Sequence, residues 1–368
     1  MFNLKDLFSF KGVHDAAASV VGIDIGSSSV KVVELQEKKG VLTLGTYGEL
    51  QLGPYADKHL GESVATTSKQ EQEAIIDIIR ESAVTAKRAV FAMPLSSSFV
   101  TNVSIEAASD ADISALVRVE ARKVIPASLS EVTLDWAEVE AAQDVNDKKN
   151  KKDDKTPIKR NILIAAIQNA ALERFKVLMQ FIQIKQPPTE IECFSVIRSL
   201  NTVADKNIAI IDIGAISTKL YIGKNGLLMR MHRIRAGGAI ATNRIASVLN
   251  ISFEEAELKK QNIRKIDKEY SDIKRAHDSS YERALREFAQ VLREYETKNE
   301  LKIASVYLSG GGAMFPGIET LVQDILGRQI VRANPFSKVS YPAFMQDTLK
   351  EIGPTFAVAL GAALRSFE

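Results

Sequence analysis

The sequence has few residues of the kinds that build cross-links or metal cages, since its 368 residues include one cysteine and four histidines. The single cysteine, Cys193, excludes an internal disulfide framework and favours a reducing compartment. The histidines are scattered, without the spacing of a zinc site. No apolar run approaches the roughly 20 residues that span a bilayer, and no signal-peptide core precedes Asp24. These absences predict a cytoplasmic protein.

Neither sign of charge dominates the chain. It carries 48 Lys and Arg against 46 Asp and Glu, a net charge of +2, so nothing predicts nucleic acid as a partner. Its 45% hydrophobic and 26% charged residues are typical of a globular protein. The length exceeds what one compact core holds, which predicts two domains or a bilobed body.

One pattern occurs twice. Residues 20–35 read VVGIDIGSSSVKVVEL, and residues 208–220 read IAIIDIGAISTKL. Each copy predicts two strands joined by a tight turn, with Gly26 or Gly214 letting the backbone approach a ligand closely. Asp24 and Asp212 are poor strand residues, so a carboxylate at each strand end needs a reason. Two such hairpins facing each other would hold a triphosphate and its Mg²⁺.

The residues after each Asp-Ile-Gly suit phosphate oxygens. Hydroxyl and N–H donors would come from Ser27, Ser28, Ser29, Ser217 and Thr218. Lys31 either reaches the phosphates or pairs with Glu34, and Lys219 has the same two options in the second copy. Either hairpin alone could be an ordinary β-turn, but the repetition favours nucleotide binding.

A glycine-rich loop follows the second copy. Residues 303–318, IASVYLSGGGAMFPGI, predict a buried strand that runs into Gly310, Gly311 and Gly312. Consecutive glycines leave no side chain between the backbone and a base or ribose. Met314 is then expected to lie against an adenine ring. The order of the three elements makes the interpretation stronger than the loop alone would.

This order resembles that of the superfamily of actin, sugar kinases and heat-shock chaperone ATPases. Within it the chain is similar to the PilM family of type IV pilus assembly proteins, and secondarily to FtsA of cell division. The resemblance implies an α/β fold, a bilobed actin-like ATPase with duplicated ribonuclease-H-like domains and an inserted small α+β subdomain, that takes ATP and Mg²⁺. The segments that carry it are GIDIGSSSVKVVEL at 22–35, AVFAMPLSSSFV at 89–100, VEARKVIPASLSEVTLDW at 119–136, IECFSVIRSL at 191–200, RIRAGGAIATNRIA at 233–246 and PTFAVALGAALR at 354–365.

The resemblance also implies roles for individual residues. Asp24 and Asp212 would face Mg²⁺, mostly through water, and Gly237 and Gly238 would form a turn at the nucleotide. Glu192 is the candidate for positioning the hydrolytic water, or else a first-turn acid that matches its helix dipole. Turnover is expected to be weak.

A second helix supplies two further candidates. Glu257 and Lys260 match a Glu-x-x-Lys helix whose side chains contact ribose and base in the family. The alternative is an ordinary solvated pair of side chains three residues apart.

The resemblance divides the chain into parts. We expect an N-terminal leader at 1–19, a first actin-like domain at 20–96 and 186–205, an inserted partner-binding subdomain at 97–185, and a second actin-like domain at 206–368, with a helical cap at about 252–300. The leader is a candidate amphipathic contact with membrane or a partner, with a disordered segment or one folded back on the body as the alternative. The charged stretch QDVNDKKNKKDDKTPIKR at 143–160 predicts a solvated loop, with a docking site as its alternative.

Three functions compete. By resemblance, the chain is an ATP-binding scaffold whose inserted subdomain holds the cytoplasmic tail of a PilN-like membrane protein, so that contact with the inner membrane is indirect and self-association stays open. An FtsA-like division protein would carry a C-terminal amphipathic helix after a linker. The sequence instead ends at ALRSFE, directly after the expected closing helix, which counts against this function. A small-molecule kinase would need a sugar pocket and a catalytic base, for which no candidate appears.

Overall fold

The computed structural model describes residues 19–139, 157–182, 189–201, 207–303 and 305–367. Residues 1–18 of the leader and residues 143–156 of the charged stretch lie outside the described residues, so the predictions made for these two segments stay predictions. Within the described ranges, no helix has both the length and the apolar character required to cross a membrane.

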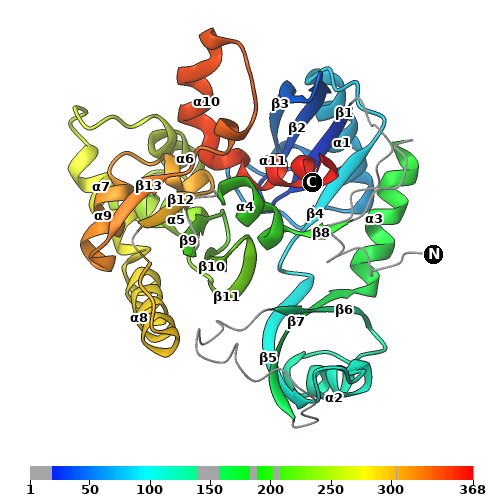
Figure 1. The fold of residues 1–368 in the computed structure, drawn as a ribbon. Helices are drawn as coiled ribbons and strands as arrows, with labels where there is room; N and C mark the ends of the chain where they lie inside the picture. The colour runs from blue at the N-terminus through cyan, green and yellow to red at the C-terminus, as the bar shows by residue number, and fades with distance from the viewer. Residues whose placement is uncertain (1–18, 140–156, 183–188, 202–206, 304, 368) are drawn as a thin grey trace.

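The first sheet contains the first copy of the repeated pattern. Its five strands run in the order β3-β2-β1-β4-β8, and β1 pairs antiparallel with β2 and parallel with β4 (Figure 1). β-branched residues fill β1 and β2 and are buried on both faces, which is typical of a central strand covered by helices. The strands are β1 (Ser19–Ile25), β2 (Ser29–Lys38), β3 (Val41–Gln51), β4 (Ala89–Met93) and β8 (Glu190–Ile191).

The second sheet repeats the first. Its order is β11-β10-β9-β12-β13, with the antiparallel hairpin β9–β10 and the parallel strand β12 in matching places. Both repeated sequence copies therefore form the predicted hairpins, and each predicted aspartate lies near the end of its strand. The strands are β9 (Asn207–Ile213), β10 (Thr218–Lys224), β11 (Leu227–Ile234), β12 (Ser305–Ser309) and β13 (Gln329–Arg332).

A third, smaller sheet, ordered β5-β7-β6, has α2 packed on it (Figure 1). Its strand β5 contacts β11 of the second sheet, where the Asn102 side chain donates to the Met229 carbonyl. The chain order is strand, helix, strand, strand, helix, in the segment where an inserted α+β subdomain is expected. The elements are β5 (Ser98–Ala107), α2 (Ser114–Val124), β6 (Val132–Val139), β7 (Ile158–Gln168) and α3 (Asn169–Phe181). Phe175 of α3 packs edge-on against Phe91 of β4, which ties α3 to the first sheet.

Two helices of small and apolar residues fill the centre of the molecule, namely α4 (Glu192–Leu200) and α11 (Ala357–Leu364). They pack on each other, and α11 also packs on β1, where its backbone comes so close that a Cβ at Gly22 would lie 1.9 Å from the Ala359 carbonyl oxygen. Only glycine fits there.

The remaining helices cover the outer faces. Helix α1 (Ser68–Glu81) begins with a capping box, in which the Thr67 side chain and Gln70 bond each other's backbone N–H groups. The second sheet carries a helical cap on its outside, which packs around Phe288 and Leu292. The cap and neighbouring helices are α5 (Gly238–Leu249), α6 (Phe253–Asn262), α7 (Tyr270–Ser279), α8 (Glu282–Asn299), α9 (Ile318–Leu326) and α10 (Gln346–Ile352).

Candidate functional site

A cleft of about 370 Å³ lies between the first and second sheets. Both repeated hairpins, the start of α4 and the glycine-rich loop after β12 reach it. Of the residues predicted to bind nucleotide or metal, the cleft is lined by Asp24, Gly26, Ser27, Lys31, Glu192, Asp212, Gly214, Ser217, Gly310 and Gly311. The predicted residues that do not line it are Ser28, Ser29, Thr218, Gly237, Gly238, Glu257, Lys260, Gly312 and Met314.

The turns of the two hairpins have the same geometry. The Gly26 N–H donates to the Ser29 carbonyl at 2.9 Å, and the Gly214 N–H donates to the Ser217 carbonyl at 3.0 Å. A Cβ at Gly26 would lie 3.0 Å from that acceptor oxygen, and one at Gly214 would lie 3.2 Å from its own. A side chain would therefore crowd either turn, which explains glycine at both places.

The two aspartates differ in their surroundings. Among the described residues, the Asp24 carboxylate forms no hydrogen bond or ion pair, and burial raises its pKa to about 6, although Lys31 acts against that shift. Asp212 forms an ion pair with Lys219 at 3.2 Å. Burial alone would lower the pKa of Lys219, but Glu192 and Asp212 raise it overall. One side of the cleft thus presents a buried carboxylate that no described residue contacts by a hydrogen bond or ion pair.

Asp24→Asn should stabilise the ligand-free chain near neutral pH. Because Asp24 holds its proton more tightly when folded, with a pKa of about 6 against 3.8, its ionisation costs stability that grows as the pH rises through these two values and is complete above about pH 6. We expect a gain on the order of 1 to 2 kcal/mol at about pH 8, since solvent screens part of the full effect. Urea unfolding measures it, with the exposed Asp324→Asn as control.

That gain should disappear as the pH falls through the two pKa values, because Asp24 is then protonated in both states. An equal gain at about pH 4 would contradict the assignment.

Lys31 does not pair with Glu34, so that alternative was wrong. Its ammonium lies 3.3 Å from the Glu49 carboxylate and donates to the Ser29 hydroxyl at 2.7 Å. Glu34 points to the other side of β2 and accepts hydrogen bonds from the backbone N–H and the hydroxyl of Thr85 at 2.7 and 2.8 Å. Side chains alternate between the faces of a strand, so residues three apart lie on opposite faces.

The predicted hydroxyl donors divide into two groups. Ser27 and Ser217 line the cleft, although Ser217 occupies in its turn the place of Ser29 and not that of Ser27. Thr218 is fully buried, and its hydroxyl donates to the Ala236 carbonyl. Ser29 is also buried and accepts from Lys31. The hydroxyls of Thr218 and Ser29 therefore serve their hairpins, whereas Ser27 and Ser217 face the cleft.

The glycine-rich loop reaches the cleft through Gly310 and Gly311. Gly310 has a φ of +86°, and a Cβ there would lie 2.6 Å from Asp212 Oδ1, so the loop presses against the second hairpin. A Cβ at Gly311 would meet nothing within 4 Å, which leaves backbone open toward the cleft. Gly312 instead packs on Ile213, whose Cγ2 lies 2.2 Å from its ideal Cβ.

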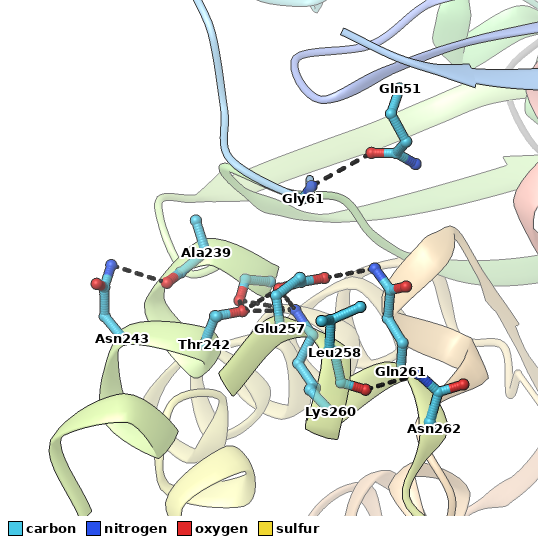
Figure 2. Close-up of polar contacts among 11 residues, drawn as sticks. Gln51, Gly61, Ala239, Thr242, Asn243, Glu257, Leu258, Lys260, Gln261 and Asn262 are labelled. Atoms are coloured by element: carbon cyan, nitrogen blue, oxygen red, sulfur yellow. Dashed lines mark hydrogen bonds and ion pairs between the residues drawn. The ribbon is translucent and has the colours of Figure 1, made fainter. Parts of the chain in front are cut away.

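The Glu257 and Lys260 pair is not solvated, so the alternative interpretation was wrong on that point. Their side chains are 5% and 15% exposed, and Figure 2 shows both converging on Thr242 of α5. The Lys260 ammonium lies 2.6 Å from Glu257 Oε2 and donates to the Gly238 carbonyl at 3.3 Å. Burial lowers the pKa of Lys260.

This cluster also touches the opposite half of the molecule. Gly61, in the segment after β3, approaches Glu257 so closely that a Cβ there would lie 2.4 Å from the carboxylate carbon (Figure 2). Nearby, His59 lies 3.2 Å from Glu254. The segment after β3 therefore lies against α6 beside the cleft.

Sequence reasoning missed several residues that line the cleft, above all Glu71 of α1 and Arg174 of α3. Arg174 Nε donates to Glu71 Oε2 at 2.7 Å, and the Thr66 hydroxyl donates to Oε1 at 2.9 Å. The two partners lie 103 residues apart, so no local spacing signals the pair. Arg233 was missed too, although its RIRAGG context was quoted, and its Nε donates to the Ser217 hydroxyl at 3.1 Å.

The donor set fits a nucleotide whose phosphates bring a cation with them. Within the described part of the chain, no three His, Cys, Asp or Glu side chains are placed to hold a metal ion by themselves. Mg²⁺ needs no such cage, because it takes phosphate oxygens and several waters and one or two carboxylates suffice. The unpaired Asp24 and the open backbone at Gly311 suit that arrangement.

Comparison with models of known protein families assigns this chain to one family. The family model described as type IV pilus assembly protein PilM matches residues 22–367, nearly the whole chain.

Solved structures share the fold. A PilM–PilN type IV pilus biogenesis complex matches with a TM-score of 0.77 at 23% identity, over 95% of this chain and 98% of the other. The ethanolamine utilization protein EutJ from Carboxydothermus hydrogenoformans matches with 0.54 at 14% identity, over 94% and 90%. MreB5 of Spiroplasma citri, solved with AMPPNP bound, matches with 0.50 at 13% identity, over 93% and 94%. The predicted actin-like fold is thereby confirmed.

Proposed function

Because the chain belongs to the PilM family of type IV pilus assembly proteins, we propose that it is a nucleotide-binding scaffold of the pilus assembly platform. The cleft between two duplicated sheets, with a carboxylate and a tight glycine turn from each, is the observation that carries the proposal. We further propose that the domain boundaries expected from the sequence separate the units that a bound nucleotide draws together.

The residues would divide the work as follows. Backbone N–H groups and hydroxyls at Ser27 and Ser217 would bind phosphate oxygens from both sides. Asp24 would face Mg²⁺ through water, and the backbone of Gly310 and Gly311 would lie along the nucleoside. Mg²⁺ when bound supplies charge neutralisation at the phosphates.

Adenosine contacts beyond the described cleft belong to the same proposal. Glu257, Lys260 and Gly238 lie together at α5 and α6, beside the segment that carries Gly61. Met314 closes the turn after the glycine-rich loop. Access of a base and ribose to this cluster would require only that the Gly61 segment move off Glu257.

We propose that the partner is the cytoplasmic tail of a PilN-like membrane protein, which places the chain at the cytoplasmic face of the inner membrane. A solved relative is a PilM–PilN complex. Helix α3 links the nucleotide cleft to the third sheet, which belongs to the subdomain proposed to bind the partner. Ala171, Arg174 and Phe175 of α3 line the cleft, and the helix follows directly from β7 of the third sheet. A change at the cleft would thus reach the third sheet through one helix.

Calorimetric titration with ATP and Mg²⁺ tests the nucleotide part. We expect micromolar ATP affinity in the wild type, and a loss of at least about tenfold in Asp24→Ala, the size of one charge-assisted interaction. Asp324→Ala, an exposed carboxylate on α9, is the matched control and should bind as the wild type.

A synthetic PilN-like tail peptide titrated afterwards tests the scaffold part, since its affinity should change when ATP is present. Absence of ATP binding in the wild type would contradict the proposal and leave a structural adaptor.

A further inference from the structure

The two lysines of the repeated pattern occupy the same place in their hairpins. Lys31 lies in register with Asp24, and Lys219 lies in register with Asp212. On its other side Lys31 lies opposite Glu49 of β3, and its ammonium is 3.3 Å from that carboxylate. Lys31 is thus held by the neighbouring strand.

Lys219 has no acid on its far side. Its partner on β11 is Arg233, a like charge that disfavours a cross-strand contact. The ammonium instead lies 2.8 Å from Glu192 Oε2 and 3.2 Å from Asp212 Oδ2. The side chains of Lys219, Glu192 and Asp212 are 12%, 9% and 9% exposed, so solvent screens these contacts little.

Glu192 is held on both of its oxygens. Oε2 is bound by Lys219, and Oε1 accepts the backbone N–H of Leu95 at 2.8 Å. The residue also begins α4, where the helix dipole favours its negative charge. The carboxylate that the sequence predicts to position water is therefore already engaged by an ammonium.

We propose that Lys219 is a positioning residue that holds Glu192 in this ion pair and so suppresses hydrolysis of the bound nucleotide. The inference rests on the proposed nucleotide site. In hydrolysis, the water oxygen bonds to the γ-phosphorus, the bond to the bridging oxygen breaks with its electron pair leaving on ADP, and Glu192 takes the water proton. The Lys219 ammonium competes with the water for Oε2, and the Leu95 N–H already occupies Oε1.

Phosphate release in single turnover tests the proposal in Lys219→Met. We expect turnover at least about tenfold faster than in the wild type, because general-base catalysis contributes factors of that size or more. Lys219→Arg keeps the ion pair and should stay slow, and Glu192→Gln added to Lys219→Met should remove the gain. Lys274→Met, which breaks an ion pair with Asp278 in α7 outside the cleft, is the control for losing a lysine.

A second readout needs no nucleotide. Without its ammonium, the carboxylate pair of Asp212 and Glu192 should bind Mn²⁺ alone more tightly, by about tenfold for one unit of charge removed. Electron paramagnetic resonance of free Mn²⁺ measures this in the wild type, Lys219→Met and Lys219→Arg. If circular dichroism shows that Lys219→Met is unfolded, Lys219→Gln, which keeps hydrogen bonding without charge, replaces it in both measurements.

The outcomes separate the two proposals. Wild-type protein that binds no ATP refutes the nucleotide site, whatever Lys219 does. A Lys219→Met variant that binds ATP but turns it over no faster, or more slowly, refutes the role of Lys219. Unchanged Mn²⁺ affinity in that variant refutes it as well, because it shows that the ammonium does not compensate these carboxylates.

Discussion

Gly361→Ala is expected to lower the free energy of unfolding by about 3 kcal/mol, at the upper end of the cost of overpacking a core. Gly361 is buried in α11, and a Cβ there would lie 1.8 Å from the Ser195 carbonyl oxygen and 2.5 Å from its carbon. Both atoms belong to the backbone of α4, so no side-chain rotation relieves the clash. The two central helices would have to separate.

Urea unfolding followed by circular dichroism measures this loss. Gly311→Ala is the matched control, because the added methyl group would meet nothing within 4 Å, and its stability should stay within about 0.5 kcal/mol of the wild type. The same control should weaken nucleotide binding, since Gly311 lines the cleft. Equal stability losses in the two variants would contradict this account of α4 and α11.

The sequence predicted the fold well where local chemistry determines structure. Two runs of β-branched residues on either side of an Asp-Ile-Gly turn are compatible with few structures other than a hairpin. Both copies of the pattern form hairpins with the same turn hydrogen bond.

The sequence did not predict which side chains meet across the cleft. Lys31 and Lys219 stand in equivalent places, yet their partners differ because β3 offers Glu49 and β11 offers Arg233 at the opposite position. Those residues belong to strands whose register is fixed by pairing over the whole sheet. The ion-pair partner of either lysine can be predicted only once the register of these strands is known.

The burial of Glu257 and Lys260 could not be predicted from the sequence either. Three residues apart on a charged helix, they have the spacing of a solvated pair. The approach of α5, with Thr242, and of Gly61 from the first half covers them. Only tertiary packing shows that this pair belongs beside the cleft.

Glu190→Ala should be the most damaging loss of a charge, lowering the free energy of unfolding by about 3 to 5 kcal/mol. Its side chain is 1% exposed and forms ion pairs with Arg198 and with Arg365, the latter at 3.7 Å. The Ser195 hydroxyl also donates to it. Removal leaves two largely buried guanidinium groups, 11% and 9% exposed, without this carboxylate.

The loss should also reach the cleft, because Glu190 is two residues from Glu192 and its partners join β8 to α4 and to the end of α11. Urea unfolding gives the stability, and ATP calorimetry gives the affinity of the fraction that remains folded. Lys69→Ala is the control, since Lys69 is 84% exposed and lies 3.7 Å from Glu73, a pair worth less than about 1 kcal/mol. If Glu190→Ala cost no more than Lys69→Ala, the buried pairs would not hold α4 in place, and the position of Glu192 would need another explanation.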